Sequence, residues 1–246
     1  MSLTIGPGIT LGAGVRIDPV YEPVTSGLQL HLDALDYTGS GTTWTAQVGP
    51  NATLINSPNW NNTTGYFDFM PTSLQYAEVP NIGDLGTWTV ECWFRLTNGL
   101  SSTQATAAVT TVYSGDSFYG VINYCLGNNS GGLNSPYLQA GFFDGAWHEV
   151  TNVFAPNNGQ WYQSVGTYNG SSLIQYTNGV QAGSTSVSAT TTANGGPIRI
   201  ARRWDAPESS EHYFPGYIAI VKIYNTALSG AQVSQNFNAT RTRFGI

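Results

Sequence analysis

The sequence predicts an all-β protein: a two-sheet antiparallel sandwich with an extended N-terminal arm and a short C-terminal helix. Aromatic residues make up 13% of the 246 residues, while charged residues make up only 9%. The 29 glycines have no regular period, and short segments alternate between apolar and polar residues. Helices with solvated faces need many charged side chains, yet Lys222 is the only lysine. This composition excludes an all-helical fold and favours strands joined by tight turns.

The predicted body of the protein begins at Gly27 and consists of short strands between turn residues. In residues 28–33 every second residue is a leucine, which is typical of a half-buried strand, and residues 37–44 are predicted as a loop. The clearest strand covers residues 87–96. One of its faces is predicted to carry Trp88, Val90, Cys92, Phe94 and Leu96, and the other Glu91, Trp93 and Arg95.

Further strands and one helix complete the predicted sandwich. Residues 161–180 resemble a hairpin, because Asn169 and Gly170 suit the positive φ angles of a tight turn. Ser229 is placed to cap a short helix whose apolar side includes Val233 and Phe237. The remaining strands are predicted near residues 74–80, 107–113, 118–126, 137–143, 161–168, 172–177, 197–202 and 216–225.

Residues 1–26 are predicted to form an arm distinct from the domain at residues 27–246. The arm is rich in glycine, and Pro19 and Pro23 make a stiff connection to the domain. An extended segment cannot bury its own apolar side chains, so we expect it to pack against the domain or a neighbouring subunit. The residues predicted to anchor it are Ile5, Ile9, Leu11, Val15 and Ile17.

Three stretches, at residues 27–44, 161–180 and 214–246, match a family pattern of opening strand, aromatic-rich hairpin, and closing strand with helix. In these stretches the chain resembles laminin-G-like, concanavalin A-like domains, especially those of tailed-phage virion proteins. The resemblance implies a jelly-roll sandwich. The family's closing strand commonly carries an acidic pair where this chain has Ala219 and Ile220, and the loop after Trp44 lacks the family's acidic residue. We therefore do not expect the calcium site of the family.

Charge and cysteine content exclude several classes of partner. The net charge of −6 does not suit the phosphate backbone, so nucleic acid is not an expected partner. The sequence has no signal peptide and no run of about 18 apolar residues, so no membrane association is expected. Cys92 and Cys125 are predicted as two buried thiols, with a single disulfide between them as the alternative.

The residues needed for catalysis or metal binding do not cluster in the sequence. Glycosidases need two carboxylates about 5–9.5 Å apart, and Glu91 is instead predicted to pair with Arg95. Asp33 and Asp36, beside His31, are the best candidate metal ligands, but one strand supplies too few of them. We therefore expect no enzyme activity, no metal and no cofactor.

Glycan binding requires only an aromatic surface and a few polar groups, and three predicted loops offer both. The alternative is that the same aromatic residues cover an edge of the sandwich or a subunit contact. The candidate glycan-binding residues are Asp116, Tyr119, Asn123, Asp144, Trp204 and Asp205.

The arm and the phage resemblance together favour a non-enzymatic structural protein of the virion. In this hypothesis the arm attaches the domain to a phage capsid or tail, through other virion proteins or further copies of the same chain, and the protein is a homo-oligomer. The alternative is an adhesin that recognises a host surface polysaccharide. A glycoside hydrolase is the third hypothesis.

Overall fold

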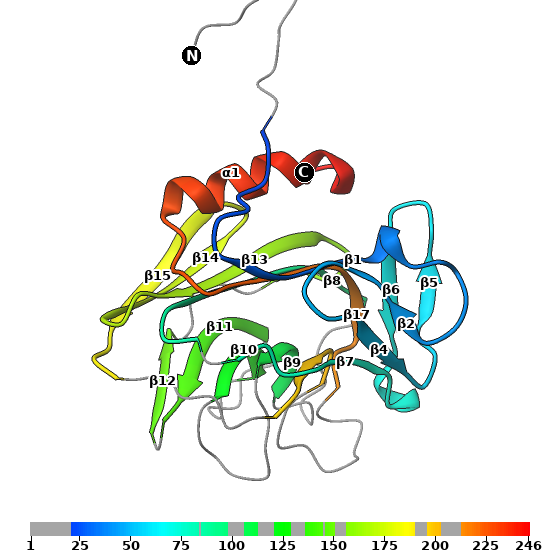
Figure 1. Cartoon of the computed structure of the whole chain (residues 1–246), viewed down its shortest axis with the longest axis horizontal. Helices are drawn as coiled ribbons and strands as arrows, with labels where there is room; N and C mark the ends of the chain where they lie inside the picture. The colour runs from blue at the N-terminus through cyan, green and yellow to red at the C-terminus, as the bar shows by residue number, and fades with distance from the viewer. Residues whose placement is uncertain are drawn as a thin grey trace, which may run out of the picture.

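The computed structural model describes residues 21–83, 85–97, 106–112, 121–128, 136–144, 146–150, 156–189, 196–202 and 213–246. There the chain forms three layers, which are two packed antiparallel sheets and a C-terminal helix across the outer face of one of them (Figure 1). The predicted all-β sandwich is confirmed. We call the sheet under the helix sheet A and the other sheet B.

In the described residues, sheet A has nine strands and sheet B has eight. Sheet A runs in the order β15 (Val180–Ser186), β14 (Ser172–Thr177), β13 (Trp161–Tyr168), β8 (Trp88–Leu96), β17 (Gly216–Tyr224), β1 (Leu28–Asp33) and β3 (Ala46–Val48), and β6 (Tyr66–Phe69) joins β17 to β5 (Asn59–Asn61). Sheet B runs in the order β12 (Trp147–Val150), β11 (Pro136–Phe143), β10 (Val121–Asn128), β9 (Thr106–Val112), β16 (Ile198–Ile200), β7 (Tyr76–Val79), β4 (Ala52–Ile55) and β2 (Thr43–Trp44).

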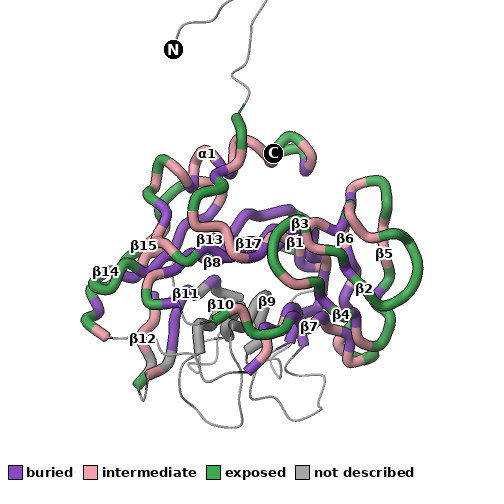
Figure 2. Tube along the Cα trace, in the orientation of Figure 1, coloured by how far each residue is buried: buried purple, intermediate pink, exposed green. Residues whose placement is uncertain are grey.

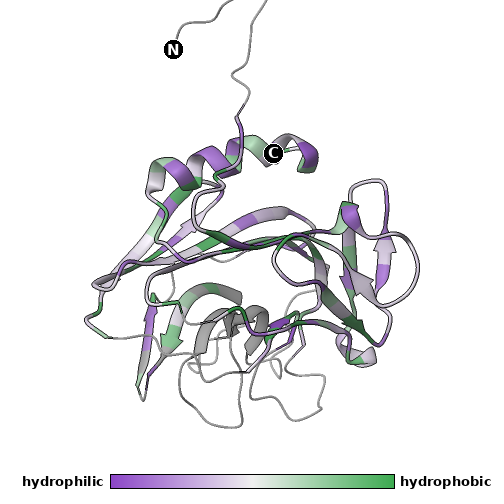
Figure 3. Cartoon of the chain, in the orientation of Figure 1, coloured by the Kyte–Doolittle hydropathy of each residue, from purple (hydrophilic) through white to green (hydrophobic). Residues whose placement is uncertain are grey.

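Aromatic and aliphatic side chains pack together in the core between the two sheets. Many residues of the facing strands are buried (Figure 2), and hydrophobic residues recur along these strands (Figure 3). Strand β8 has the two faces predicted for it. Trp88, Val90, Cys92, Phe94 and Leu96 point into this core, whereas Trp93 packs on the outer face of sheet A. Cys92 is a buried thiol, as predicted, whereas the Cys125 side chain lies outside the described residues. Burying one large side chain contributes roughly 1.5–3 kcal/mol, so this inward row is a major source of stability.

The predicted hairpin and helix are both present. Strands β13 and β14 pair antiparallel across a turn in which Gly170 has a φ of 93°, and the Asn169 side chain accepts hydrogen bonds from the backbone of Ser171 and Ser172. Helix α1 (Gly230–Thr240) begins at a capping box between Ser229 and Gln232. The 3-10 helix η4 (Arg241–Phe244) follows it. Within the described ranges, no helix combines the length and apolar character needed to cross a bilayer.

Several short strands were missed by the sequence prediction. Residues 43–69 contain β2 to β6, although part of this range was predicted as a loop. Each of these strands has two to four residues, too few to establish an alternating pattern. Strand β15 is an edge strand with mostly exposed or half-buried residues, so it carries no apolar face to detect.

The last residues of the predicted arm are fixed to the body. The Val24 backbone N–H donates to Asn236 Oδ1 at 2.8 Å, and the Tyr224 hydroxyl donates to the Val24 carbonyl at 3.0 Å. The Gln235 side chain donates to the Glu22 carbonyl at 2.6 Å. Residues 22–24 therefore belong structurally to the domain and hold α1 in place. The five predicted anchoring residues of the arm lie outside the described residues.

Candidate functional site

A buried polar cluster lies between sheet A and α1, centred on Glu91. This side chain is 0% exposed. Its Oε1 accepts hydrogen bonds from Gln163 at 3.0 Å and Trp93 at 3.2 Å, and its Oε2 accepts one from Asn236 at 2.7 Å. The Lys222 ammonium lies 3.8 Å from Oε1.

The predicted pairing of Glu91 with Arg95 is therefore wrong. It rested on the expectation that the outer face of β8 is solvated, whereas α1 covers the half of that face where Glu91 lies. The partners of Glu91 come from β13, β17 and α1, and this proximity is a product of the tertiary fold. A carboxylate that has no exposed surface and accepts three hydrogen bonds stabilises the fold and is not accessible to a substrate.

Beyond the C-terminal segment, the outer face of sheet A carries a row of residues that crosses five strands. Strand register places Asp68 opposite Tyr217, Tyr217 opposite Arg95, and Arg95 opposite Trp161. Asn59 lies opposite Asp68 at the end of the row. We call Asn59, Asp68, Tyr217, Arg95 and Trp161, together with Tyr66, the outer row.

Aromatic rings form the centre of the outer row. Tyr66 stacks on Tyr217 with ring centroids 4.3 Å apart and an interplanar angle of 18°. Trp161 lies 5.7 Å from Tyr66 and 6.3 Å from Tyr217, and it packs against Phe244 of η4 at 4.5 Å. The Arg95 guanidinium carbon lies 4.9 Å from the Tyr217 ring centroid. These contacts fix the Tyr217 ring before any ligand arrives.

Two charged side chains, Asp68 and Arg95, flank this aromatic centre, and their hydrogen-bonding capacity is unused in the described part of the chain. Within the described residues, neither Asp68 nor Arg95 has a hydrogen bond or an ion pair from its side chain, and Arg95 Nε is buried. Both side chains are half-buried, as are Tyr66 and Tyr217. Burial raises the pKa of the Asp68 carboxyl above its usual range. Burial, Tyr217 and Asp68 together raise the pKa of the Tyr66 phenol.

This arrangement has the groups that bind a sugar. Aromatic rings pack against the C–H surface of a pyranose, and a carboxylate, a guanidinium and an amide bind its hydroxyl groups. Asp68 supplies the carboxylate, Arg95 the guanidinium and Asn59 an exposed amide. The outer row holds one carboxylate, whereas paired-carboxylate hydrolysis needs two.

Most of the glycan-binding residues predicted from the sequence cannot be placed. Asp116, Tyr119, Trp204 and Asp205 lie outside the described residues, and Asn123 lies in β10 with its side chain outside them. Asp144 follows β11, where it accepts hydrogen bonds from the Ala146 backbone and from His148 Nε2 at 2.9 Å. Both contacts are local, with residues two and four positions further along the chain. The described part of the chain therefore brings no distant residues to Asp144 to form a binding site.

The candidate metal ligands have protein partners. Asp33 accepts hydrogen bonds from Arg243 Nη1 at 2.7 Å and from the Leu35 backbone at 2.9 Å, and it caps the 3-10 helix η1 (Ala34–Asp36). Asp36 accepts one from Gln47 at 2.8 Å. Over the described ranges, no group of three or more His, Cys, Asp or Glu side chains is arranged to hold a metal ion.

Residues 71–234, two thirds of the chain, match the sequence profile of the concanavalin A-like lectin/glucanases superfamily. The chain belongs to this superfamily. The resemblance noted in the sequence is thus confirmed for the domain, and this concanavalin A-like domain has the sandwich expected of it. A search of curated proteins found no match.

Solved structures of similar fold include three complexes, with arabinotriose, SialylT and sialic acid. Domain 4 of AbnA, a GH43 extracellular arabinanase from Geobacillus stearothermophilus in complex with arabinotriose, aligns with a TM-score of 0.59 and 14% identity over 86% of this chain and 99% of that one. The binding domain of botulinum neurotoxin DC in complex with SialylT aligns with a TM-score of 0.63 and 14% identity, over 87% of this chain and 52% of that one. Trypanosoma rangeli sialidase in complex with sialic acid aligns with a TM-score of 0.60 and 14% identity, over 95% of this chain and 37% of that one. The domain thus spans about half of the toxin structure and about a third of the sialidase, and at this identity the likeness is one of fold.

Proposed function

We propose that the protein is a non-enzymatic carbohydrate-binding domain and that an oligosaccharide binds along the outer row. The observation that carries the proposal is the placement of Tyr217 between Asp68 and Arg95, two charged side chains that make no hydrogen bond or ion pair among the described residues. A sugar ring on the Tyr66–Tyr217 pair is within reach of both. The fold's use by saccharide-binding domains in other proteins supports the same ligand class.

A glycan array with matched variants tests this proposal. The full-length protein is expected to bind a defined set of oligosaccharides, and Tyr217→Ala is expected to weaken binding by at least about tenfold, since aromatic stacking and the Arg95 contact are lost together. Val180→Ala is the matched control, because Val180 is 69% exposed on β15 at the far edge of sheet A. If Tyr217→Ala binds the same glycans as strongly as the control, the outer row is not the site.

We propose in addition that the arm attaches this domain to a phage capsid or tail, through other virion proteins or further copies of the chain. Glu22 and Val24 are fixed on α1, so the arm starts from a rigid point on the outer layer. A rigid starting point suits an attachment segment whose apolar residues, Ile5 to Ile17, pack on a neighbour. The carbohydrate-binding face and the attachment arm are compatible in one adhesive virion protein.

Removing the arm tests the attachment proposal. A chain that begins at Tyr21 is expected to remain folded and to be monomeric in light scattering, whereas the full chain forms a homo-oligomer. A chain that begins at Gly27 is a poorer choice, because it also loses the Val24 hydrogen bonds that hold α1. The same number of subunits per particle for the two chains would contradict self-association through the arm. Binding of the full chain to purified virions would then test attachment to other virion proteins.

A further inference from the structure

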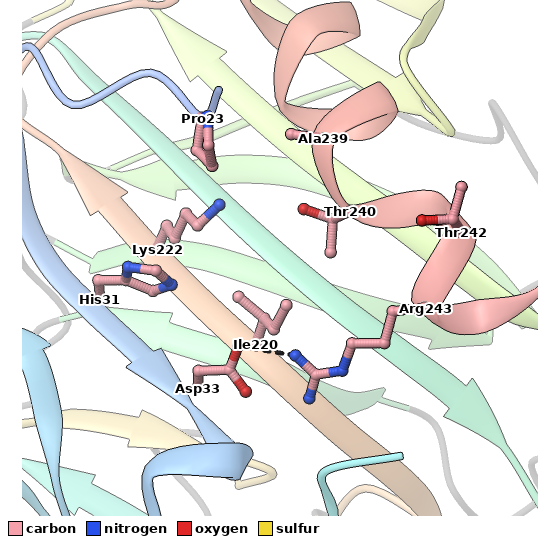
Figure 4. Close-up of a pocket in the computed structure, with 9 residues that line it drawn as sticks. All are labelled: Pro23, His31, Asp33, Ile220, Lys222, Ala239, Thr240, Thr242 and Arg243. Carbon is pink, nitrogen blue, oxygen red and sulfur yellow. Dashed lines mark hydrogen bonds and ion pairs between the residues drawn. The ribbon is translucent and has the colours of Figure 1, made fainter. Parts of the chain in front are cut away.

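A cavity of about 210 Å³ lies on the outer face of sheet A, between β1, β17 and the C-terminal segment (Figure 4). Its floor is formed by the sheet, and Ala239, Thr240 and Thr242 close it from the helical side. The cavity is lined by Pro23, His31, Asp33, Ile220, Lys222, Ala239, Thr240, Thr242 and Arg243.

The side chain of Lys222 is the unusual feature of this cavity. It is 2% exposed, and its ammonium lies 3.8 Å from Glu91 Oε1, which is beyond hydrogen-bond distance. Both Glu91 oxygens already accept hydrogen bonds from neutral donors. Among the described residues the ammonium makes no hydrogen bond, and its nitrogen points into the cavity between Pro23 and Thr240 (Figure 4). Three N–H donors of a buried cation are thus left for a ligand.

The other charged groups of the cavity already have hydrogen-bond partners. Arg243 donates to Asp33 at 2.7 Å, to the Thr64 carbonyl at 2.7 Å and to the Gly65 carbonyl at 2.6 Å. His31 lies opposite Lys222 in the strand register. Burial, and then the nearby Lys222 ammonium, lower the pKa of His31, so its ring is neutral at pH 7. Lys222 is balanced in charge by Glu91, but its ammonium is the charged group of the cavity whose N–H donors make no hydrogen bond among the described residues.

We propose that this cavity binds a monocarboxylate, with the carboxylate group accepting hydrogen bonds from the Lys222 ammonium and the Thr240 hydroxyl. The Thr240 oxygen points towards the side of the cavity where Lys222 lies (Figure 4). A carboxylate oxygen is a strong acceptor for an ammonium whose N–H donors are unused, and the volume accommodates a carboxylate with a short carbon chain or one sugar ring. The apolar wall of Ile220 and Pro23 suits the carbon part of such a ligand.

The single lysine allows a direct test on the full-length protein. Labelling with ¹³C-lysine gives one Cε–Hε signal, that of Lys222, and needs no assignment. Sodium acetate and sodium D-glucuronate are expected to shift this signal saturably. Sodium chloride at the same ionic strength and D-glucose are expected to leave it in place. A response to glucuronate alone identifies an acidic sugar as the ligand, and a response to acetate identifies the carboxylate as sufficient.

Variants separate this site from non-specific effects and from the outer row. Thr240→Val is expected to raise the Kd about tenfold through loss of one hydrogen bond to a charged group, whereas Thr53→Val, at an exposed position of β4, leaves it unchanged. Tyr217→Ala is also expected to leave it unchanged, so either site can fail without the other. An equal shift with chloride, the absence of a shift with both carboxylates, or an unaltered Kd in Thr240→Val overturns the proposal.

Discussion

Glu91→Ala is expected to lower the free energy of unfolding by about 3–5 kcal/mol, the cost of removing one partner from a buried ion pair. The substitution leaves the Lys222 ammonium, 2% exposed, without a carboxylate. It also leaves the Gln163, Asn236 and Trp93 donors without their acceptor under α1. Chemical denaturation followed by tryptophan fluorescence measures the loss.

Two further variants show whether burial is the cause of that loss. Glu78→Ala removes a carboxylate whose side chain is 37% exposed and which pairs with Arg199 at 3.4 Å, and this exposed pair is expected to contribute less than about 1 kcal/mol. The double variant Glu91→Met with Lys222→Met removes both buried charges, so it is expected to be more stable than Glu91→Ala. Equal effects of Glu91→Ala and Glu78→Ala would contradict the burial of Glu91.

Phe244→Ala is expected to lower the free energy of unfolding by about 3 kcal/mol, although the residue is third from the C-terminus. Its ring packs 4.6 Å from Trp93 and 4.5 Å from Trp161, and it holds η4 on sheet A. Ile246→Ala is the matched control, since Ile246 is 36% exposed and its loss is expected to change stability by less than about 0.5 kcal/mol. Thermal unfolding of the two variants compares them, and similar melting temperatures would show that the C-terminal segment does not stabilise the sheet as described.

Local patterns in the sequence predicted the parts of the fold that depend on neighbouring residues. The alternation in residues 87–96 predicted both faces of β8, the Asn169-Gly170 pair predicted the β13–β14 turn, and Ser229 predicted the start of α1. In each case a few adjacent residues carry the full signal. The short strands between residues 43 and 69 were missed because none of them is long enough to show an alternation.

The outer row could not be predicted from the sequence, because its members come together only through strand order. Asp68 and Tyr217 are separated by about 150 positions and become neighbours when β6 pairs with β17. In the segment 66–69, Tyr66 and Asp68 share one face and Phe67 and Phe69 the other, but four residues are too few to be recognised as a strand. The pattern does not say which strand lies beside it. The same limit explains Glu91, whose partners come from three other elements.

The most direct test of carbohydrate binding on the outer row is an NMR titration of the isotope-labelled full-length protein with the strongest glycan from the array. We expect the largest chemical-shift changes at Tyr66, Arg95 and Tyr217, with smaller changes at Asn59 and Asp68. Changes that instead concentrate at Tyr119 or Trp204, with the outer row unaffected, would contradict this account and place the glycan on the loops.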